Sequence, residues 1–210
     1  MTDKMEDKKK EVCRKNWENF WYYHKFHVII GVFVIAVIAV FVRDKLKQID
    51  YDYTVAVVTA EGIPQEALGE LQSVLENIAS DRNNDKKVHV LIQNYAIGNK
   101  NGESSNPQIT MANQQKFIVD AQTGTSMLLI YTDEVYEMYK KQGLFAVEDG
   151  TPVKMGECSA FTEMKDGDSL RNLNISLRNI DESLWSKKKD LKAYYEDSER
   201  LLERFMYGDK

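Results

Sequence analysis

Few side chains of this 210-residue chain have the chemistry of a general base or an activated nucleophile. Of its three histidines, His24 and His27 lie beside a long apolar run, and His89 lies in a predicted strand. A serine or cysteine nucleophile would therefore have to share His89 as its base. We interpret His89 as a structural residue of the strand rather than as a general base. The sequence predicts no catalytic residue, and we expect that the protein is not an enzyme.

Metal-ligand patterns are also weak. The two cysteines, Cys13 and Cys158, and the histidines show no zinc-ligand spacing. Residues 81–85 carry oxygen ligands at alternate positions, as a calcium-binding loop does, but Lys86 and Ile92 stand where that loop requires glycine and a bidentate glutamate. We interpret residues 81–85 as a polar turn between a helix and a strand. No glycine-rich phosphate-binding loop follows a predicted strand, and we predict neither a metal nor a cofactor.

Polar and aromatic side chains gather where three predicted strands end. Ligands of open α/β sheets bind outside the carboxyl ends of the parallel strands, so side chains at these positions are candidates for ligand contacts. Threonine and asparagine can hydrogen-bond a solute, and tyrosine offers a stacking face. The candidate ligand-binding residues are Thr59, Asn94, Tyr95, Tyr131, Thr132 and Asp133. The alternative, which we favour for Thr132 and Asp133, is that they cap the helix that follows them.

Alternating strands and helices must position these residues. Residues 53–58 are apolar on both faces, as a buried parallel strand requires. Pro64 suits the first turn of a helix that runs to Ser80. Residues 88–97 form the next predicted strand, and a polar loop at 98–106 follows it.

The second half of the chain continues this alternation. A helix capped by Asn106 ends at Gly124, residues 127–131 form a third buried strand, and a helix with two acids in its first turn follows. The last predicted elements are strands near 160–164 and 173–177 and an amphipathic helix at 188–205. This order predicts a three-layer α/β domain with a mainly parallel sheet.

The longest apolar run of the chain predicts a membrane segment. Residues 28–42 carry no charge and are interrupted only by Gly31. At about 1.5 Å per residue this run is roughly 22 Å long, shorter than the roughly 30 Å hydrocarbon core, so a spanning helix needs more residues. Aromatic residues that suit the headgroup level lie just before it: Trp17, Phe20, Trp21, Tyr22, Tyr23 and Phe26. We predict a transmembrane helix at 22–42 rather than a buried core helix.

Lysine and arginine residues around the run predict its orientation. Seven precede it and three follow it closely, which favours a cytoplasmic N-terminus and an extracytoplasmic C-terminal part. Bulky residues close the run where signal peptidase requires small ones, so we expect an uncleaved anchor. The predicted organisation is a cytoplasmic segment at 1–21, a transmembrane helix at 22–42, a stalk at 43–50 and an extracytoplasmic α/β domain at 51–210.

Charge and cysteine usage narrow the classes of function. The chain has 28 Lys and Arg against 33 Asp and Glu, a net charge of −5, and the acidic excess follows the apolar run. An acidic domain repels phosphate backbones, so nucleic-acid binding is disfavoured. Cys13 and Cys158 lie on opposite sides of the predicted membrane and are not expected to pair. A domain without a disulfide fits a bacterial cell surface better than an animal secretory route.

One stretch of the domain resembles a known family. Residues 124–134 are Gly-Thr-Ser-Met-Leu-Leu-Ile-Tyr-Thr-Asp-Glu, and residues 141–147 are Lys-Gln-Gly-Leu-Phe-Ala-Val. These residues resemble the first lobe of type II extracellular (periplasmic-type) solute-binding proteins. In that lobe a glycine ends a helix, an apolar strand and a helix with an acidic cap follow, and a Gly-Leu pair closes the unit. The resemblance implies one lobe of that fold, and an extracytoplasmic module for a solute or for a protein partner such as a membrane complex or a transporter.

Three classes of function remain open from the sequence. The first is a non-catalytic, membrane-anchored binding or accessory module that recognises a protein partner or a small solute. The second is a bitopic structural or assembly component of the cell envelope. The third is an extracytoplasmic hydrolase, which the shortage of acid–base side chains disfavours. Because one lobe cannot enclose a solute as two lobes can, we favour a protein partner.

Overall fold

The computed structural model of the protein describes residues 3–47, 49–98, 106–147, 151–180 and 189–208. The chain divides into two compact units, residues 1–49 and residues 50–210. The predicted loop at 98–106 lies almost entirely outside the described residues.

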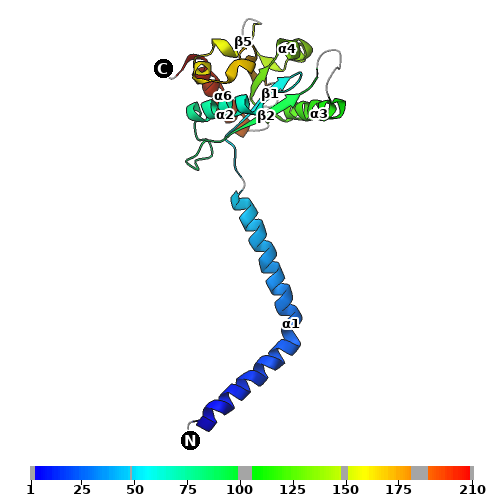
Figure 1. Ribbon diagram of the computed structural model, residues 1–210, viewed down its shortest axis with the longest axis vertical. Helices are drawn as coiled ribbons and strands as arrows, with labels where there is room; N and C mark the ends of the chain where they lie inside the picture. Colours follow the sequence, from blue (N-terminus) through cyan, green and yellow to red (C-terminus); the bar gives the residue numbers. More distant parts are fainter. Residues whose placement is uncertain (1–2, 48, 99–105, 148–150, 181–188, 209–210) are drawn as a thin grey trace. The chain divides into compact units, whose positions relative to one another are not determined.

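The first unit consists of one long helix, α1 (Asp3–Lys47; Figure 1). It contains a 26-residue stretch, Phe20–Lys45, that is long and apolar enough to cross a membrane, and none of this stretch is buried. At about 1.5 Å per residue the stretch is about 39 Å long, which exceeds the roughly 30 Å hydrocarbon core. The helix continues beyond both ends of the predicted span at 22–42, because the charged residues around the span are good helix formers and no proline interrupts them.

The second unit is built on a six-stranded sheet. Its strands are β1 (Tyr53–Thr59), β2 (Val90–Ala96), β3 (Leu128–Tyr131), β4 (Phe145–Ala146), β5 (Val153–Lys154) and β6 (Asn174–Arg178). The strand order is β2-β1-β3-β6-β4, and β5 also pairs with β6. As predicted, β1 pairs in parallel with β2 and β3, whereas β6 is antiparallel to β3, β4 and β5. The sheet is therefore mixed, and its longest pairing is parallel.

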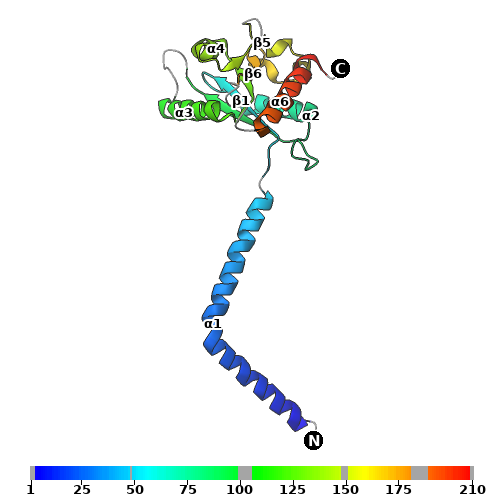
Figure 2. The ribbon, with the colours of Figure 1, turned by 180° about the vertical axis from the view of Figure 1, so that it is seen from behind.

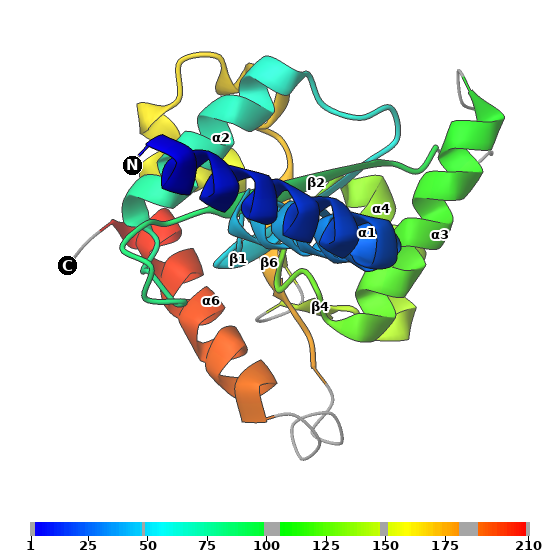
Figure 3. The same cartoon turned by 90° about the horizontal axis from the view of Figure 1, so that it is seen from below.

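Helices cover both faces of this sheet (Figures 1 and 2). Val55 and Val57 of β1 belong to a core with α2 (Gln65–Ile78) and α6 (Lys189–Tyr207). Ala56 and Val58, on the other face, belong to a core with α3 (Pro107–Thr123) and α4 (Asp133–Tyr139). Figure 3 shows these two pairs of helices on opposite sides of the strands. The predicted three-layer arrangement is confirmed, since side chains alternate between the two faces of a strand.

The ends of α3 and α4 follow the predicted capping residues. Asn106 caps α3 through its side chain, which accepts a hydrogen bond from the Ile109 N–H (3.4 Å). Gly124 ends the helix in a left-handed conformation with φ of 71°, which favours glycine. After α4, the 3₁₀ helix η1 (Lys140–Gln142) ends in the same way at Gly143, with φ of 66°.

The strand predicted near 160–164 is wrong, because the chain forms the 3₁₀ helix η4 (Ser159–Glu163) there. The Phe161 N–H donates to the Cys158 carbonyl oxygen (3.2 Å), as a 3₁₀ turn requires. Ala160 and Phe161 are both buried, although neighbouring residues of a half-buried strand would face opposite sides.

The antiparallel direction of β6 was also not predicted. Between β5 and β6 the chain forms η3 (Met155–Glu157), η4 and η5 (Gly167–Ser169), which are 3₁₀ helices and not an α-helical crossover. A parallel neighbour needs a long crossover connection, usually a helix, so the chain returns here as an antiparallel strand. The predicted strand at 173–177 itself is confirmed, one residue displaced.

Candidate functional site

The carboxyl ends of β1 and β2 hold one loop in place. Thr59 Oγ1 accepts a hydrogen bond from the Gly62 N–H (2.9 Å). The Asn94 side chain binds both backbone groups of Ile63: Nδ2 donates to the carbonyl oxygen (2.9 Å), and Oδ1 accepts from the N–H (3.3 Å). Thr59 and Asn94 thus lie at the same loop, and their polar atoms stabilise the connection from β1 to α2.

Tyr95 and Tyr131 are buried on the face of the sheet covered by α3 and α4. The Tyr95 hydroxyl contacts Gln93 Oε1 and donates to Asp120 Oδ2 (2.9 Å); burial, together with the Asp120 charge, raises the pKa of Tyr95. The Tyr131 hydroxyl donates to Ser176 Oγ (3.0 Å), and burial raises the pKa of Tyr131 to about 12. Both side chains are therefore neutral and packed inside the domain, where they offer no stacking face to solvent.

Thr132 and Asp133 lie at the start of α4. Thr132 caps the helix, with Oγ1 accepting from the Val135 N–H (3.3 Å). Asp133 Oδ1 accepts from Lys154 Nζ (2.6 Å) and from Asn174 Nδ2 (2.7 Å). These two contacts, with Lys154 the stronger, hold the pKa of Asp133 below its usual range. The cap that we favoured for Thr132 is confirmed, and Asp133 also ties α4 to β5 and β6.

Lys154 and Asn174 belong to this edge of the sheet but were not predicted. Lys154 ends the two-residue strand β5, and Asn174 begins β6 opposite Tyr131. Asn174 is buried, and its Oδ1 atom has no hydrogen-bond partner among the described residues. The six predicted residues therefore fall into separate places: Thr59 and Asn94 at one loop, Tyr95 and Tyr131 in the core, and Thr132 and Asp133 at the start of α4. Ligand binding by these residues stays a prediction.

A concave surface lies between α6 and the strands β4, β5 and β6. This groove has a volume of about 590 Å³, within the range of known ligand pockets. Apolar residues of β4, β5 and β6 form one side, and half-buried residues of α6 form the other. The apolar lining residues include Ala146, Val153, Ile175, Leu177, Tyr195, Leu202 and Met206, and Thr151, Ser176 and Asn179 add polar groups. Tyr195 and Leu202 lie on the apolar side of the predicted amphipathic helix, and only the fold shows that they also line a groove.

The groove carries acidic charge at its rim. Its charged lining residues are Glu199 and Glu203, which are exposed and one helical turn apart on α6. Neither forms an ion pair with any other residue that the structure describes. Burial, reinforced by the Glu199 charge, raises the pKa of Tyr195 inside the groove. The groove therefore suits an apolar group that also carries positive charge.

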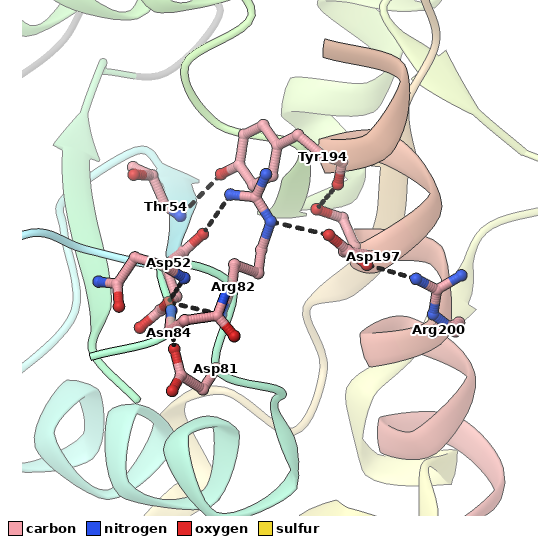
Figure 4. Close-up of polar contacts among 10 residues, drawn as sticks. Asp52, Thr54, Asp81, Arg82, Asn84, Tyr194, Asp197 and Arg200 are labelled. Atoms are coloured by element: carbon pink, nitrogen blue, oxygen red, sulfur yellow. Dashed lines mark hydrogen bonds and ion pairs between the residues drawn. The ribbon is translucent and has the colours of Figure 1, made fainter. Parts of the chain in front are cut away.

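A polar cluster fixes α6 against the start of β1 (Figure 4). Arg82 Nε lies 2.9 Å from Asp197 Oδ2, its Nη1 donates to the Asp52 carbonyl oxygen (2.9 Å), and its guanidinium lies 4.4 Å from the centre of the Tyr194 ring. The buried Asp52 carboxylate accepts from the backbone N–H groups of Arg82 (2.8 Å) and His89 (2.9 Å). His89 thus takes part through its backbone, and the cluster positions the helix that lines the groove.

The predicted polar turn at 81–85 is confirmed. The Asp81 carboxylate accepts from the backbone N–H groups of Asn84 (2.7 Å) and Lys86 (2.8 Å). Within the described ranges, no three His, Cys, Asp or Glu side chains gather in a way that could hold a metal ion.

Comparisons of the chain with protein-family models, curated proteins and solved structures give no match. The resemblance to one lobe of type II solute-binding proteins therefore stays a prediction, based on residues 124–134 and 141–147. What the chain has is an N-terminal apolar helix and a mixed, three-layer α/β domain.

Proposed function

We propose that this protein is a membrane-anchored, extracytoplasmic module that binds a protein partner at the cell surface and acts without catalysis. The anchor is the apolar stretch Phe20–Lys45 of α1, none of which is buried. A lipid bilayer stabilises such a helix, because exposing apolar surface to water costs about 25 cal/mol of free energy per Å². The Lys and Arg bias of the flanks supports a cytoplasmic N-terminus.

The observation that carries the binding role is the groove beside α6. Its apolar sides and the carboxylates of Glu199 and Glu203 favour a partner segment with apolar side chains next to Lys or Arg. The apolar side chains gain affinity by burial, and the basic side chains select the partner through charge.

The side-chain bonds at the carboxyl ends of the strands favour a protein partner at the groove over a solute bound at these ends. Asn94 already bonds the backbone of Ile63, and Asp133 already bonds Lys154 and Asn174. A solute at this edge would have to replace these bonds, which lowers its net affinity. A partner at the groove displaces no side-chain bond between Glu199 or Glu203 and another described residue.

Site-specific photo-crosslinking in intact cells tests the proposal. A photoreactive phenylalanine analogue replaces Tyr207, which lines the groove, or, as the matched control, Tyr51, which is exposed but outside it. We expect one membrane-protein adduct from position 207 and none from position 51. The adduct should disappear when Glu199→Lys and Glu203→Lys are added, because the rim charge is reversed.

The exposed residues Glu157 and Glu163 provide a matched charge control. Glu157→Lys with Glu163→Lys changes the net charge equally and should leave the adduct in place. Equal adducts from both positions, or an adduct insensitive to the rim charges, would contradict binding at the groove. A melting-temperature shift with one class of solute, lost in Asn94→Ala or Asp133→Ala, would instead support a solute binder.

A further inference from the structure

Strand β2 lies at one edge of the sheet. It pairs with β1 on one side, and no described strand pairs with it on the other. Its seven residues, Val-Leu-Ile-Gln-Asn-Tyr-Ala, include no charge and no proline. Edge strands of soluble domains are usually short or carry charges or proline, because an open row of N–H and C=O groups pairs readily with another strand.

The direction of the free backbone groups follows from the bonds to β1. The Ile97 N–H donates to the Thr59 carbonyl oxygen (2.9 Å), and the His89 carbonyl oxygen accepts from the Asp52 N–H (2.8 Å). Because residues of a strand alternate in the side to which their N–H and C=O point, odd-numbered residues of β2 face β1. Residues 90, 92, 94 and 96 therefore point away from the sheet.

Side chains already bind the first and the last of the backbone groups that point away from the sheet. The Val90 N–H donates to Glu76 Oε1 (3.0 Å), and Asn113 Nδ2 donates to the Ala96 carbonyl oxygen (3.2 Å). The outward groups between them, for which no bond to a described residue is seen, are the C=O of Val90, the N–H and C=O of Ile92 and of Asn94, and the N–H of Ala96. These groups are symmetric about Gln93, the middle residue of the strand.

This symmetry matches an antiparallel copy of the same strand. With a two-fold axis at Gln93, Ile92 lies opposite Asn94 of the second copy, and each such pair exchanges both of its N–H···O bonds. Gln93 then faces its own counterpart as a non-hydrogen-bonded pair. The pairing ends where Glu76 and Asn113 already bind the strand.

Helix α3 lies next to β2 and adds apolar surface to this edge (Figure 3). Val119 is 56% exposed and lies on the side of α3 that faces β2. A cavity of about 460 Å³ between α3 and β2 is lined by Gln93, Val119 and others. Its exposed charge is Lys116, while the Asp120 carboxylate is buried and bonded to Tyr95 and Ser126.

We propose that this surface joins two copies of the chain, with β2 pairing antiparallel about Gln93 to form one continuous sheet and α3 of each copy covering the join. A second copy fits better than another partner because the free backbone groups are self-complementary. An uncharged strand also lets two acidic chains meet without strong repulsion. The pairing is independent of the groove beside α6.

Disulfide trapping of the full-length protein in lipid nanodiscs tests the register. In an antiparallel pair, non-hydrogen-bonded Cα atoms lie about 4.5 Å apart, within disulfide range. In a Cys13→Ser background, Gln93→Cys should give a disulfide-linked dimer under mild oxidation. Gln142→Cys, an exposed glutamine beyond the far end of α4, is the matched control and should stay unlinked.

A charge swap at the same position gives a second, independent readout. Gln93→Lys and Gln93→Glu each place like charges opposite one another and should weaken self-association about fivefold, measured with differently tagged copies. Mixing the two variants should restore association, because the charges are then opposite. A circular-dichroism melt checks that each variant is folded.

Three outcomes would overturn the proposal. They are a Gln93→Cys chain that links no better than Gln142→Cys, charge variants that associate like the original chain, and a mixture that fails to recover association. Self-association through α1 alone would give the first two results, so the experiment separates it from pairing through β2.

Discussion

At the scale of single residues, the buried side chain of Tyr131 makes the stability of this fold depend on pH. The side chain is fully buried, its ring centre lies 4.1 Å from that of Phe145, and its hydroxyl donates to Ser176. Removing the phenolic proton would place a charge in an apolar core, so burial raises the pKa from about 10 to about 12.

This shift predicts a loss of stability in alkali. The folded-state pKa lies above that of the unfolded chain, so neutral Tyr131 contributes fully below about pH 10, and the contribution is lost as pH rises through about 12. Urea unfolding of the full-length protein across this range should show a falling free energy of unfolding, with a smaller slope in Tyr131→Phe. Tyr51→Phe, at an exposed tyrosine, should behave like the original chain. Identical slopes in all three proteins would contradict the assignment.

At the scale of elements, the placement of α6 depends on contacts made by Arg82. This side chain pairs with Asp197, stacks on Tyr194 and binds the Asp52 backbone, with about a quarter of its surface exposed. Arg200 also pairs with Asp197 but is 57% exposed. The two arginines therefore share a partner and differ in burial.

We expect Arg82→Ala to lower the free energy of unfolding by about 2 kcal/mol, because the partly buried Asp197 carboxylate loses the more buried of its two partners and two other contacts of Arg82 are lost. Arg200→Ala should cost less than about 0.5 kcal/mol, since exposed ion pairs contribute little. Urea unfolding measures both values, and hydrogen exchange should show faster exchange in α6 for Arg82→Ala only. Equal effects of the two changes would show that the cluster does not hold the helix.

The glycine that ends α3 supplies another prediction at this scale. Gly124 has φ of 71°, and a Cβ there would lie 3.5 Å from both Arg178 and Leu191, so Gly124→Ala should destabilise the domain by about 1 kcal/mol. Gly69 lies within α2, where a Cβ would meet nothing within 4 Å. Gly69→Ala should therefore stabilise by about 0.5–1 kcal/mol. Thermal unfolding would contradict this reasoning if both changes shifted the melting temperature in the same direction.

At the scale of the whole molecule, the chain combines an unburied apolar helix with a separate α/β unit. The proposed orientation places Cys13 inside the cell and the α/β unit outside. Cys158 is buried in its core and so does not report on topology.

A membrane-impermeant maleimide on intact cells tests this orientation. An exposed reporter, Gln142→Cys, should be labelled on intact cells, whereas the original chain should be labelled only after permeabilisation, at Cys13. Labelling of Cys13 on intact cells, together with protection of the reporter, would reverse the proposed topology.

The sequence by itself determined the elements whose signals act over a few residues. Asn106 and Gly124 bound α3, Thr132 begins α4, and apolar runs mark β1 and β3, because capping and side-chain periodicity are local properties. The same reasoning found the carboxyl ends of the parallel strands, where the candidate ligand residues lie. It also found the apolar helix, whose length and composition are properties of the sequence alone.

Only the tertiary structure decided which distant residues meet. Strands β4 and β5 have two residues each, too few for periodicity to be visible, and they exist because β6 binds both. The partners of Asp133, which are Lys154 and Asn174, come from these late strands. The groove beside α6 and the free edge of β2 likewise depend on strand order, which long-range packing selects and no local pattern encodes.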